Sequence, residues 1–427
     1  MTDARPLCSG HLRSGLRAFA VLGFSLMLAA CNGLGGRTAP TPVVVAPPPT
    51  VQVQPPPRVD VPAMRDPARF YTPAHMAGAQ PIRVALLLPF NSPRDNVRTL
   101  SNAIYNAAQL ALFEFDNRQI LLIPKATGGT SGGAQRAAQE ALSAGADLIL
   151  GPLFAEEVTA VAPLAASARV PVVAFSSDSS VAGNGVYLLS FPLDQDIDRI
   201  VEFATLQGLQ SFGALYPQGT YGNRARNAFE RAVAARAGQM VAATSYPADS
   251  EGMYEPARRI AASYGGGNFQ ALFLPEGGAQ LKTISPLLPY YDLDPRQVKF
   301  LGTGLWDDPS LALEPPLHGA WFPAPPPEGH AQFLTRYKRA YGSTTPPRIA
   351  SLGYDAASLA VALATRPAGE RFSTEALTDP DGFAGVDGIF RFMPDGRTER
   401  GLAVMEIRAG GAVVVDPAPT SFRPPLF

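Results

Sequence analysis

The sequence predicts an α/β fold of two lobes, each a parallel sheet flanked by helices. Continuous apolar runs with the character of buried strands alternate with segments of helical periodicity, which is typical of parallel sheets covered on both faces. The alternation restarts near residue 209, which indicates a second lobe. Two such lobes, joined by several crossings of the chain, enclose a cleft at the carboxyl ends of their strands.

The first thirty residues are expected to be a secretory signal peptide. Arg13 and Arg17 precede an apolar run over residues 18–30, too short for a permanent membrane helix, which needs about 20 residues. Leu28-Ala29-Ala30-Cys31 resembles a bacterial lipobox, which predicts lipid attachment at Cys31 and a membrane anchor. Asn32, in place of the aspartate that would favour the inner membrane, predicts the periplasmic face of the outer membrane. The alternative is an ordinary signal peptide with an unrelated cysteine.

Residues 31–80 are expected to form a tether between the anchor and the folded body. The stretch "APTPVVVAPPPTVQVQPPPRVDVP" favours extended polyproline II over helix or sheet. Cys8 and Cys31 are the two cysteines of the chain, so no disulfide is expected in the body, residues 81–427. A net charge of −1 gives no reason to expect nucleic acid as a partner.

The body divides into lobe 1, residues 81–208 and 342–427, and lobe 2, residues 209–341. Lobe 1 is expected to begin with strand 82–89, helix 99–117, strand 120–123, helix 132–144, strand 147–150, helix 155–168, strands 170–175 and 186–191, and helix 194–207. Lobe 2 is expected to contain strand 212–216, helix 221–237, strand 240–246, helix 254–264, strand 271–274, helix 278–288, strand 298–301 and helix 329–341. Helix 350–364 then returns to lobe 1, and the tail alternates in twos around Pro394-Asp395-Gly396, which predicts antiparallel strands.

Several stretches, in this order, resemble the type I periplasmic-binding-protein fold. They are "IRVALLLPF", "GADLILGPLFAEEVTAVAPLA", "VPVVAFSSD", "GALYPQGTYG" and "GVDGIFRFMPDG". The chain most resembles the penicillin-binding protein activators, the lipoprotein branch related to leucine-binding proteins. The resemblance implies a lipid-anchored regulator that contacts a peptidoglycan synthase, a bifunctional penicillin-binding protein. The alternative is a substrate-binding lipoprotein of an ABC importer for amino acids or related solutes.

Candidate cleft residues are those just past the strand ends. In lobe 1 they are Phe90, Asn91, Thr127, Thr130, Gly151, Pro152, Leu153, Phe154, Ser176, Ser177 and Asp178, and in lobe 2 Tyr221, Glu276 and Trp306. Two simpler interpretations stay open: Ser176 to Asp178 as a solvated turn, and Trp306 as core packing.

An amino-acid site needs partners for a carboxylate and an ammonium group. After Gly151-Pro152 the sequence offers no hydroxyl, and Glu156 and Glu157 in the first helical turn discourage an added anion. The family resemblance places Glu276 where importer relatives have an ammonium partner. A partner for the ammonium group is therefore expected, but none for the carboxylate.

An enzyme is not expected. The run from Gly129 to Gly133 fits the G-x-S-x-G pattern of a nucleophile elbow, but the preceding strand is expected to break at Pro124. The body offers only His318 and His330 as bases, both in proline-rich or crossover segments. No His, Asp and Glu group has metal-ligand spacing, and no cofactor is expected.

Overall fold

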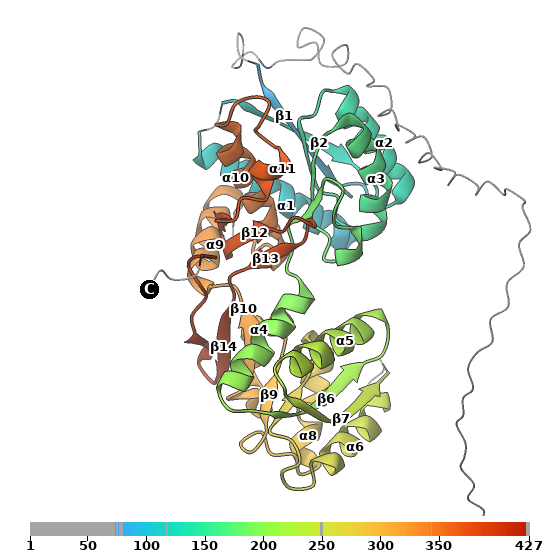
Figure 1. The fold of residues 1–427 in the computed structure, drawn as a ribbon, viewed down its shortest axis with the longest axis vertical. Helices are drawn as coiled ribbons and strands as arrows, with labels where there is room; N and C mark the ends of the chain where they lie inside the picture. The colour runs from blue at the N-terminus through green and yellow to red at the C-terminus, as the bar shows by residue number, and fades with distance from the viewer. Residues whose placement is uncertain are drawn as a thin grey trace, which may run out of the picture. The chain divides into compact units, whose positions relative to one another are not determined.

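A computed structural model describes residues 80–423, apart from residues 117, 248–250 and 343, together with Pro73 and Met76. The predicted signal peptide, Cys31 and nearly all of the predicted tether lie outside the described residues. The described residues belong to one compact unit of the chain, in which two α/β lobes are visible (Figure 1). Within this part of the chain, no helix has the length and apolar character needed to cross a membrane.

Lobe 1 is built on a five-stranded parallel sheet with the order β2-β1-β3-β4-β5. The strands are β1 (Ile82–Leu88), β2 (Ile120–Ala126), β3 (Leu148–Leu150), β4 (Val172–Ala174) and β5 (Val186–Leu188). Every residue of β1 is buried, as expected for a continuous apolar run at the centre of a sheet. The expected break at Pro124 is wrong: β2 continues to Ala126, because β2 lies at the sheet edge, where proline is tolerated.

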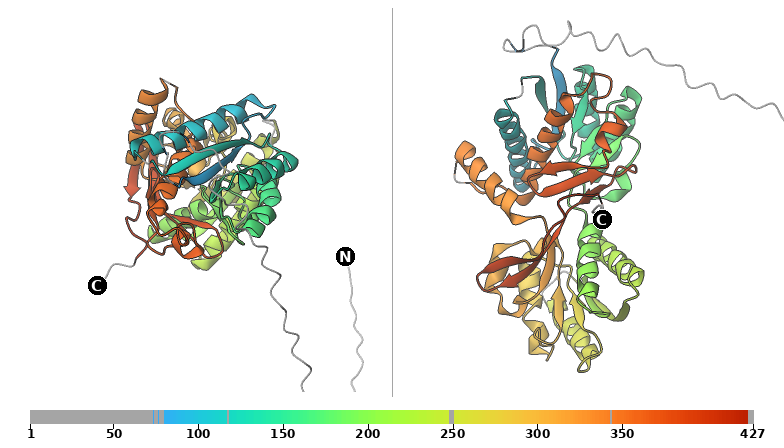
Figure 2. Two further views of the ribbon diagram at one scale, coloured as in Figure 1. Left: turned by 90° about the horizontal axis from the view of Figure 1, so that it is seen from above. Right: turned by 60° about the vertical axis from the view of Figure 1, so that its left-hand side comes forward.

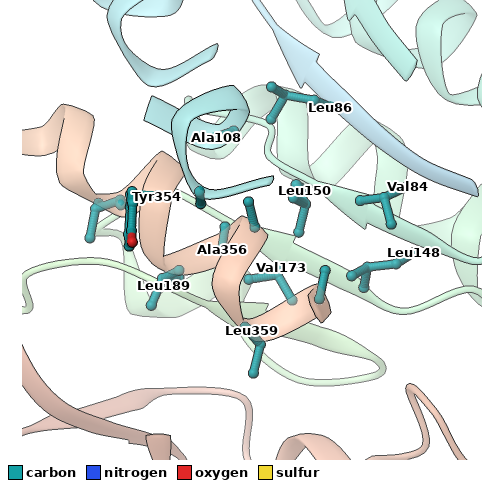
Figure 3. Packing of buried hydrophobic residues seen from close by; sticks show 14 of the residues in the cluster. Val84, Leu86, Ala108, Leu148, Leu150, Val173, Leu189, Tyr354, Ala356 and Leu359 are labelled. Atoms are coloured by element: carbon teal, nitrogen blue, oxygen red, sulfur yellow. The ribbon is translucent and has the colours of Figure 1, made fainter. Parts of the chain in front are cut away.

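Helices cover both faces of this sheet. One face carries α2 (Ser131–Ser143) and α3 (Ala155–Ala168). The other carries α1 (Asp95–Glu114), α9 (Pro327–Tyr341) and α10 (Ser351–Ala364). Figure 3 shows the strand residues Leu86 and Leu150 facing Ala108 of α1 and Ala356 of α10. The predicted return of the helix near 350–364 to lobe 1 is confirmed.

Lobe 2 is built on a seven-stranded sheet with the order β15-β14-β10-β9-β8-β6-β7. Its strands are β6 (Ser211–Pro217), β7 (Gln239–Tyr246), β8 (Ala271–Phe273), β9 (Lys299–Leu301), β10 (Trp321–Ala324), β14 (Ala403–Arg408) and β15 (Gly411–Asp416). The first five run parallel, and β14 and β15 are antiparallel to their neighbours.

Lobe 2 also has helices on both faces of its sheet. They are α4 (Leu193–Leu206) and α5 (Thr220–Ala235) on one face, and α6 (Tyr254–Tyr264), α7 (Gly278–Ile284) and α8 (Leu287–Tyr290) on the other. The helix expected over 278–288 is divided into α7 and α8 at Ser285-Pro286, since proline cannot donate the backbone hydrogen bond of a helix interior.

A small antiparallel sheet completes lobe 1. It consists of β11 (Phe383–Gly385), β12 (Gly388–Phe392) and β13 (Thr398–Arg400), and the short helix α11 (Thr374–Leu377) precedes it. Phe390 and Phe392 belong to the lobe 1 core. The antiparallel tail around Pro394-Asp395-Gly396 is therefore confirmed.

The expected lobe bounds differ from the structure in three places. α4 packs in the lobe 2 core instead of ending lobe 1, and α9 packs on α1 in lobe 1 instead of ending lobe 2. The strands β14 and β15 join the lobe 2 sheet, where β14 lies beside the orange strand β10 and β15 forms the edge (Figures 1 and 2). Lobe 1 thus comprises residues 81–190 and 327–400, and lobe 2 residues 193–324 and 402–416. An apolar helix face fits either sheet, so its periodicity did not reveal which one it covers.

Candidate ligand cleft

The turn after β3 is held tightly against the neighbouring strand. Gly151 has a φ of 83°, and a Cβ at this position would stand 2.2 Å from the carbonyl oxygen of Leu87 in β1. Its backbone N–H donates to the carbonyl of Val173 at 2.8 Å. Only glycine allows both the left-handed backbone and this approach, and the turn therefore presents Leu153 and Phe154 at a fixed place.

Glu157 lies inside the protein instead of at the surface. Its side chain is fully buried, and its carboxylate accepts hydrogen bonds from the backbone N–H of Phe154, at 3.2 Å, and from the hydroxyl of Thr127. Burial raises the pKa of Glu157, although these two hydrogen bonds act in the opposite direction. Glu156 is exposed. One buried carboxylate thus caps the start of α3 from within.

A pocket of about 530 Å³ lies at the carboxyl end of the lobe 1 sheet. Five of the predicted residues meet there, namely Leu153, Phe154, Ser176, Ser177 and Asp178. Sequence reasoning missed the others, which are Leu100, Ala155, Phe175, Ser190, Phe191, Ile349 and Leu352. The lining is mainly apolar and aromatic, with hydroxyls and one carboxylate, which is the usual composition of a small-molecule site.

Other predicted lobe 1 residues have structural contacts instead. Phe90 packs edge-on against Tyr105 with ring centroids 5.8 Å apart, and Asn91 is exposed. Thr127 is buried against Glu157, and the hydroxyl of Thr130 accepts from the backbone of Gly133 at 3.1 Å to cap α2.

Ser176 and Asp178 fit both interpretations of the sequence, as cleft residues and as a turn. The Ser176 hydroxyl accepts from the backbone N–H of Asp178 at 3.2 Å. The Asp178 carboxylate accepts from the backbone N–H of Ser180 at 3.0 Å, and this hydrogen bond lowers the pKa of Asp178. The segment is therefore a capping turn that also forms part of the pocket wall.

On lobe 2, Glu276 is held by three contacts. Its carboxylate accepts from the Tyr246 hydroxyl at 2.7 Å and from the backbone N–H of Gly277 at 3.0 Å. Its carbonyl accepts from the indole N–H of Trp306 at 2.8 Å. Trp306 is 1% exposed, so it is a core residue that positions Glu276 instead of a cleft-lining residue. Tyr221, with its side chain hydrogen-bonded to Thr303, is partly exposed.

Two polar contacts join the lobes beside the pocket. Arg224 of α5 donates to the carbonyl of Ser177 at 3.1 Å, and Arg348 of lobe 1 forms an ion pair with Asp307 of lobe 2. At the pocket rim, the guanidinium of Arg94 lies 5.4 Å from the ring centroid of Phe154. Lobe 2 therefore contacts the pocket at Ser177, while the lining residues come from lobe 1 and, at Phe191, from a crossing between the lobes.

A buried charged cluster lies next to the pocket lining. Arg400 donates to the carbonyl of Ser190 at 2.7 Å, and its guanidinium lies 4.6 Å from the ring centroid of Phe191. Burial, with the nearby charge of Asp387, raises the pKa of Asp355 to about 7. Burial alone would raise the pKa of Asp387, but contacts that include His330, Arg348 and Arg400 outweigh it and lower this pKa to about 2. No short-range pattern in the sequence brings these residues together.

The nucleophile-elbow geometry is not formed by the predicted residues. Ser131 is the exposed first residue of α2, and its hydroxyl donates to the carbonyl of Glu156 at 3.3 Å. His318 bonds to the carbonyl of Ala312 at 2.9 Å, and His330 faces Asp387 at 3.5 Å. Among the contacts of the described residues, neither histidine meets Ser131.

Comparison with known proteins identifies the fold and the family. The chain resembles a branched-chain amino acid ABC transporter periplasmic ligand-binding protein from Burkholderia xenovorans, at 16% identity over 79% of this chain and 96% of that one, with a TM-score of 0.65. It also resembles an R. palustris ABC transporter solute-binding protein in complex with benzoate, at 17% identity over 79% of this chain and 97% of that one, with a TM-score of 0.57. A leucine-binding protein from Thermotoga maritima is similar too, at 20% identity over 78% of this chain and 97% of that one, with a TM-score of 0.56.

These likenesses support the two-lobed fold of type I periplasmic binding proteins. No curated protein matches the chain. The sequence profile of the family described as "Periplasmic binding protein" matches residues 81–412, which covers both lobes and the three crossings between them. The chain belongs to the periplasmic binding protein family.

Proposed function

We propose that this chain is a solute receptor of an ABC importer, which binds a small molecule between its lobes. The observation that carries the proposal is the pocket of about 530 Å³ at the carboxyl ends of the lobe 1 strands, where apolar side chains surround Ser176 and Ser177. Structural neighbours described as ABC transporter proteins support the same reading. The family also favours a periplasmic location.

The pocket favours an uncharged or cationic solute with an apolar body. The Phe154, Phe175 and Phe191 rings supply an apolar surface of the kind that holds a ring or branched chain. The buried carboxylate of Glu157 lies at the start of α3 and opposes the positive end of the helix dipole, which would otherwise attract an anion. Glu276 on lobe 2 provides an acceptor for a cationic group.

A thermal-shift screen tests the proposal with the purified chain. The panel contains aromatic acids, their amides, aromatic amines, and branched-chain amino acids. A ligand present at 100 times its Kd adds about 2.7 kcal/mol to the free energy of unfolding. We expect amides or amines to raise Tm more than the matching acids, and Phe154→Ala to abolish the shift. Phe113→Ala, at a residue that is 74% exposed on α1, is the matched control and should leave the shift intact.

The variant Glu157→Gln separates the charge argument from the binding argument. Glutamine keeps an acceptor for the Phe154 N–H and removes the negative charge. We expect the acids of the panel to gain affinity relative to their amides in this variant. If no compound of the panel raises the Tm of the native chain, the receptor proposal is wrong. If Glu157→Gln keeps the native ratio of acid to amide affinity, only the charge argument is wrong.

The regulator of peptidoglycan synthesis implied by the family resemblance stays a prediction. The comparisons support the importer alternative better than this reading. A pull-down with a purified bifunctional penicillin-binding protein tests it, and the receptor proposal expects no capture. Lipid attachment at Cys31 also stays a proposal. Metabolic labelling with a fatty acid should label the native chain, and the label should be lost in Cys31→Ala.

A further inference from the structure

After the last strand, the chain returns from lobe 2 to lobe 1. At the lobe 2 end, Asp416 of β15 forms an ion pair with Arg199 of α4, and Ala418 packs against the lobe 2 core. At the lobe 1 end, the guanidinium of Arg391 in β12 lies 4.6 Å from the ring centroid of Phe422. Two guanidinium nitrogens of Arg423 bond both carboxylate oxygens of Asp381. Residues 417–423 thus form a strap with one end on each lobe.

The strap runs beside a crossing that the fold already has. Gly401 lies between β13 of lobe 1 and β14 of lobe 2, and the carbonyl oxygen of Pro419 is 2.9 Å from the point where a Cβ on Gly401 would stand. Pro417 and Pro419 each fix the backbone φ near −65°, which limits how far the strap can change its own shape. The strap is therefore a short and restricted connection close to the hinge.

A short strap can stay attached at both ends only over a limited range of lobe positions. The six residues 417–422 span at most about 20 Å when fully extended, at roughly 3.3–3.6 Å per residue. A lobe rotation that separates Asp416 from Phe422 further must detach one end. The Arg391 contact and the paired Asp381–Arg423 bonds oppose such detachment, since two parallel hydrogen bonds to one carboxylate fix geometry as well as charge.

We propose that the C-terminal strap restricts the relative rotation of the two lobes, adding to the crossings at residues 191–192, 325–326 and 401. The strap would thereby regulate how the cleft opens, an inference that rests on the proposed function for its biological meaning. The restriction itself is a property of the chain without ligand. A ligand-free measurement therefore separates its failure from a failure of the receptor proposal.

Distance measurements between spin labels on the two lobes test the strap. Cys8 and Cys31 are replaced by serine, and cysteines are introduced at the exposed positions Ser143 of lobe 1 and Ala262 of lobe 2. We expect Phe422→Ala combined with Arg423→Ala to broaden the distribution of interlobe distances in the ligand-free chain. Arg296→Ala is the matched control, because Arg296 pairs with Asp294 within lobe 2 and links no lobes.

A charge exchange makes the test specific to the ion pair. Arg423→Asp alone should broaden the distribution through repulsion from Asp381, and Asp381→Arg together with Arg423→Asp should restore the native width. Far-UV circular dichroism verifies that each variant is folded. A native width in the Phe422→Ala, Arg423→Ala variant would overturn the proposal, and so would equal broadening in Arg296→Ala.

Discussion

Gly151→Ala is expected to lower the free energy of unfolding by about 1–4 kcal/mol, the sum of a backbone cost and a steric cost less the gain from a restricted unfolded chain. With a φ of 83°, this position costs an L-residue roughly 1–2 kcal/mol. The new Cβ would also stand 2.2 Å from the carbonyl oxygen of Leu87, far inside van der Waals contact. Since Leu87 lies in the fully buried strand β1, only a shift of the sheet relieves the clash, and such overpacking costs about 1–3 kcal/mol.

Gly208→Ala provides a control that separates the two costs. Gly208 has a similar φ of 87°, but a Cβ there would meet no atom within 4 Å. Its substitution should therefore show only the backbone cost of about 1–2 kcal/mol, reduced by about 0.4–1 kcal/mol because alanine restricts the unfolded chain. The difference between the two variants isolates the approach of the turn to β1.

Urea-induced unfolding, followed by far-UV circular dichroism, measures both variants against the native chain. We expect Gly151→Ala to lose about 1–3 kcal/mol more than Gly208→Ala, with similar m values. Equal losses would refute the reasoning, because they would mean that the Leu87 carbonyl moves aside at no cost. In that case the turn would not hold Leu153 and Phe154 at a fixed place in the pocket.

Three further changes test the buried polar groups. Burial raises the pKa of Asp355 to about 7, so the folded state keeps a proton that the unfolded state releases near pH 4. The contribution of Asp355 to the free energy of unfolding therefore falls as pH rises from about 4 to about 7. Urea unfolding at several pH values should show a flatter pH dependence of this free energy in Asp355→Asn. An unchanged pH dependence would contradict the raised pKa of Asp355. Arg348→Ala removes the guanidinium that forms an ion pair with buried Asp387 and leaves Arg400 and His330 as its nearby partners. The loss of this charged contact should cost about 1.5–3 kcal/mol by the same assay, whereas a loss below about 1 kcal/mol would contradict this role. Tyr246→Phe removes the hydroxyl that donates to Glu276 and should weaken binding of a cationic solute by about tenfold in calorimetry, or about 1.4 kcal/mol; unchanged affinity would place Glu276 outside the site.

Most of the order of strands and helices could be predicted from the sequence because most changes of periodicity are marked by glycine or proline. The strand β10 was missed, since it lies in a proline-rich stretch. The helix expected over 155–168 is the observed α3, which follows Gly151-Pro152 and ends before Arg169 in the left-handed conformation. Lobe membership could not be predicted in the same way. The amphipathic face of α4 would fit against either sheet. Its assignment to lobe 2 follows only from the contacts of its buried residues with the lobe 2 strands.

The pocket was predictable where its residues follow strand ends. Leu153, Phe154 and Ser176 to Asp178 come directly after β3 and β4, and parallel strands end at the same edge of a sheet. Leu100 and Leu352 come instead from α1 and α10, which flank the sheet and are far apart in the sequence. Their helical spacing predicted core packing, and nothing local distinguishes a core position from one at the cleft.

Glu157 shows how one side-chain direction changes the functional reading. As an exposed helix residue it would only add negative charge at the surface, which salt screens. Inside the protein, its carboxylate accepts from Thr127 and the Phe154 N–H, so it occupies a donor at the start of α3 that a ligand anion would need. The position three residues after the N-cap is where a glutamate commonly reaches back to the backbone, and this spacing is the sequence signal for it. The N-terminus of α3 is thus already bound by a side chain of its own helix, and this is the physical basis of the proposal that the solute does not depend on a carboxylate.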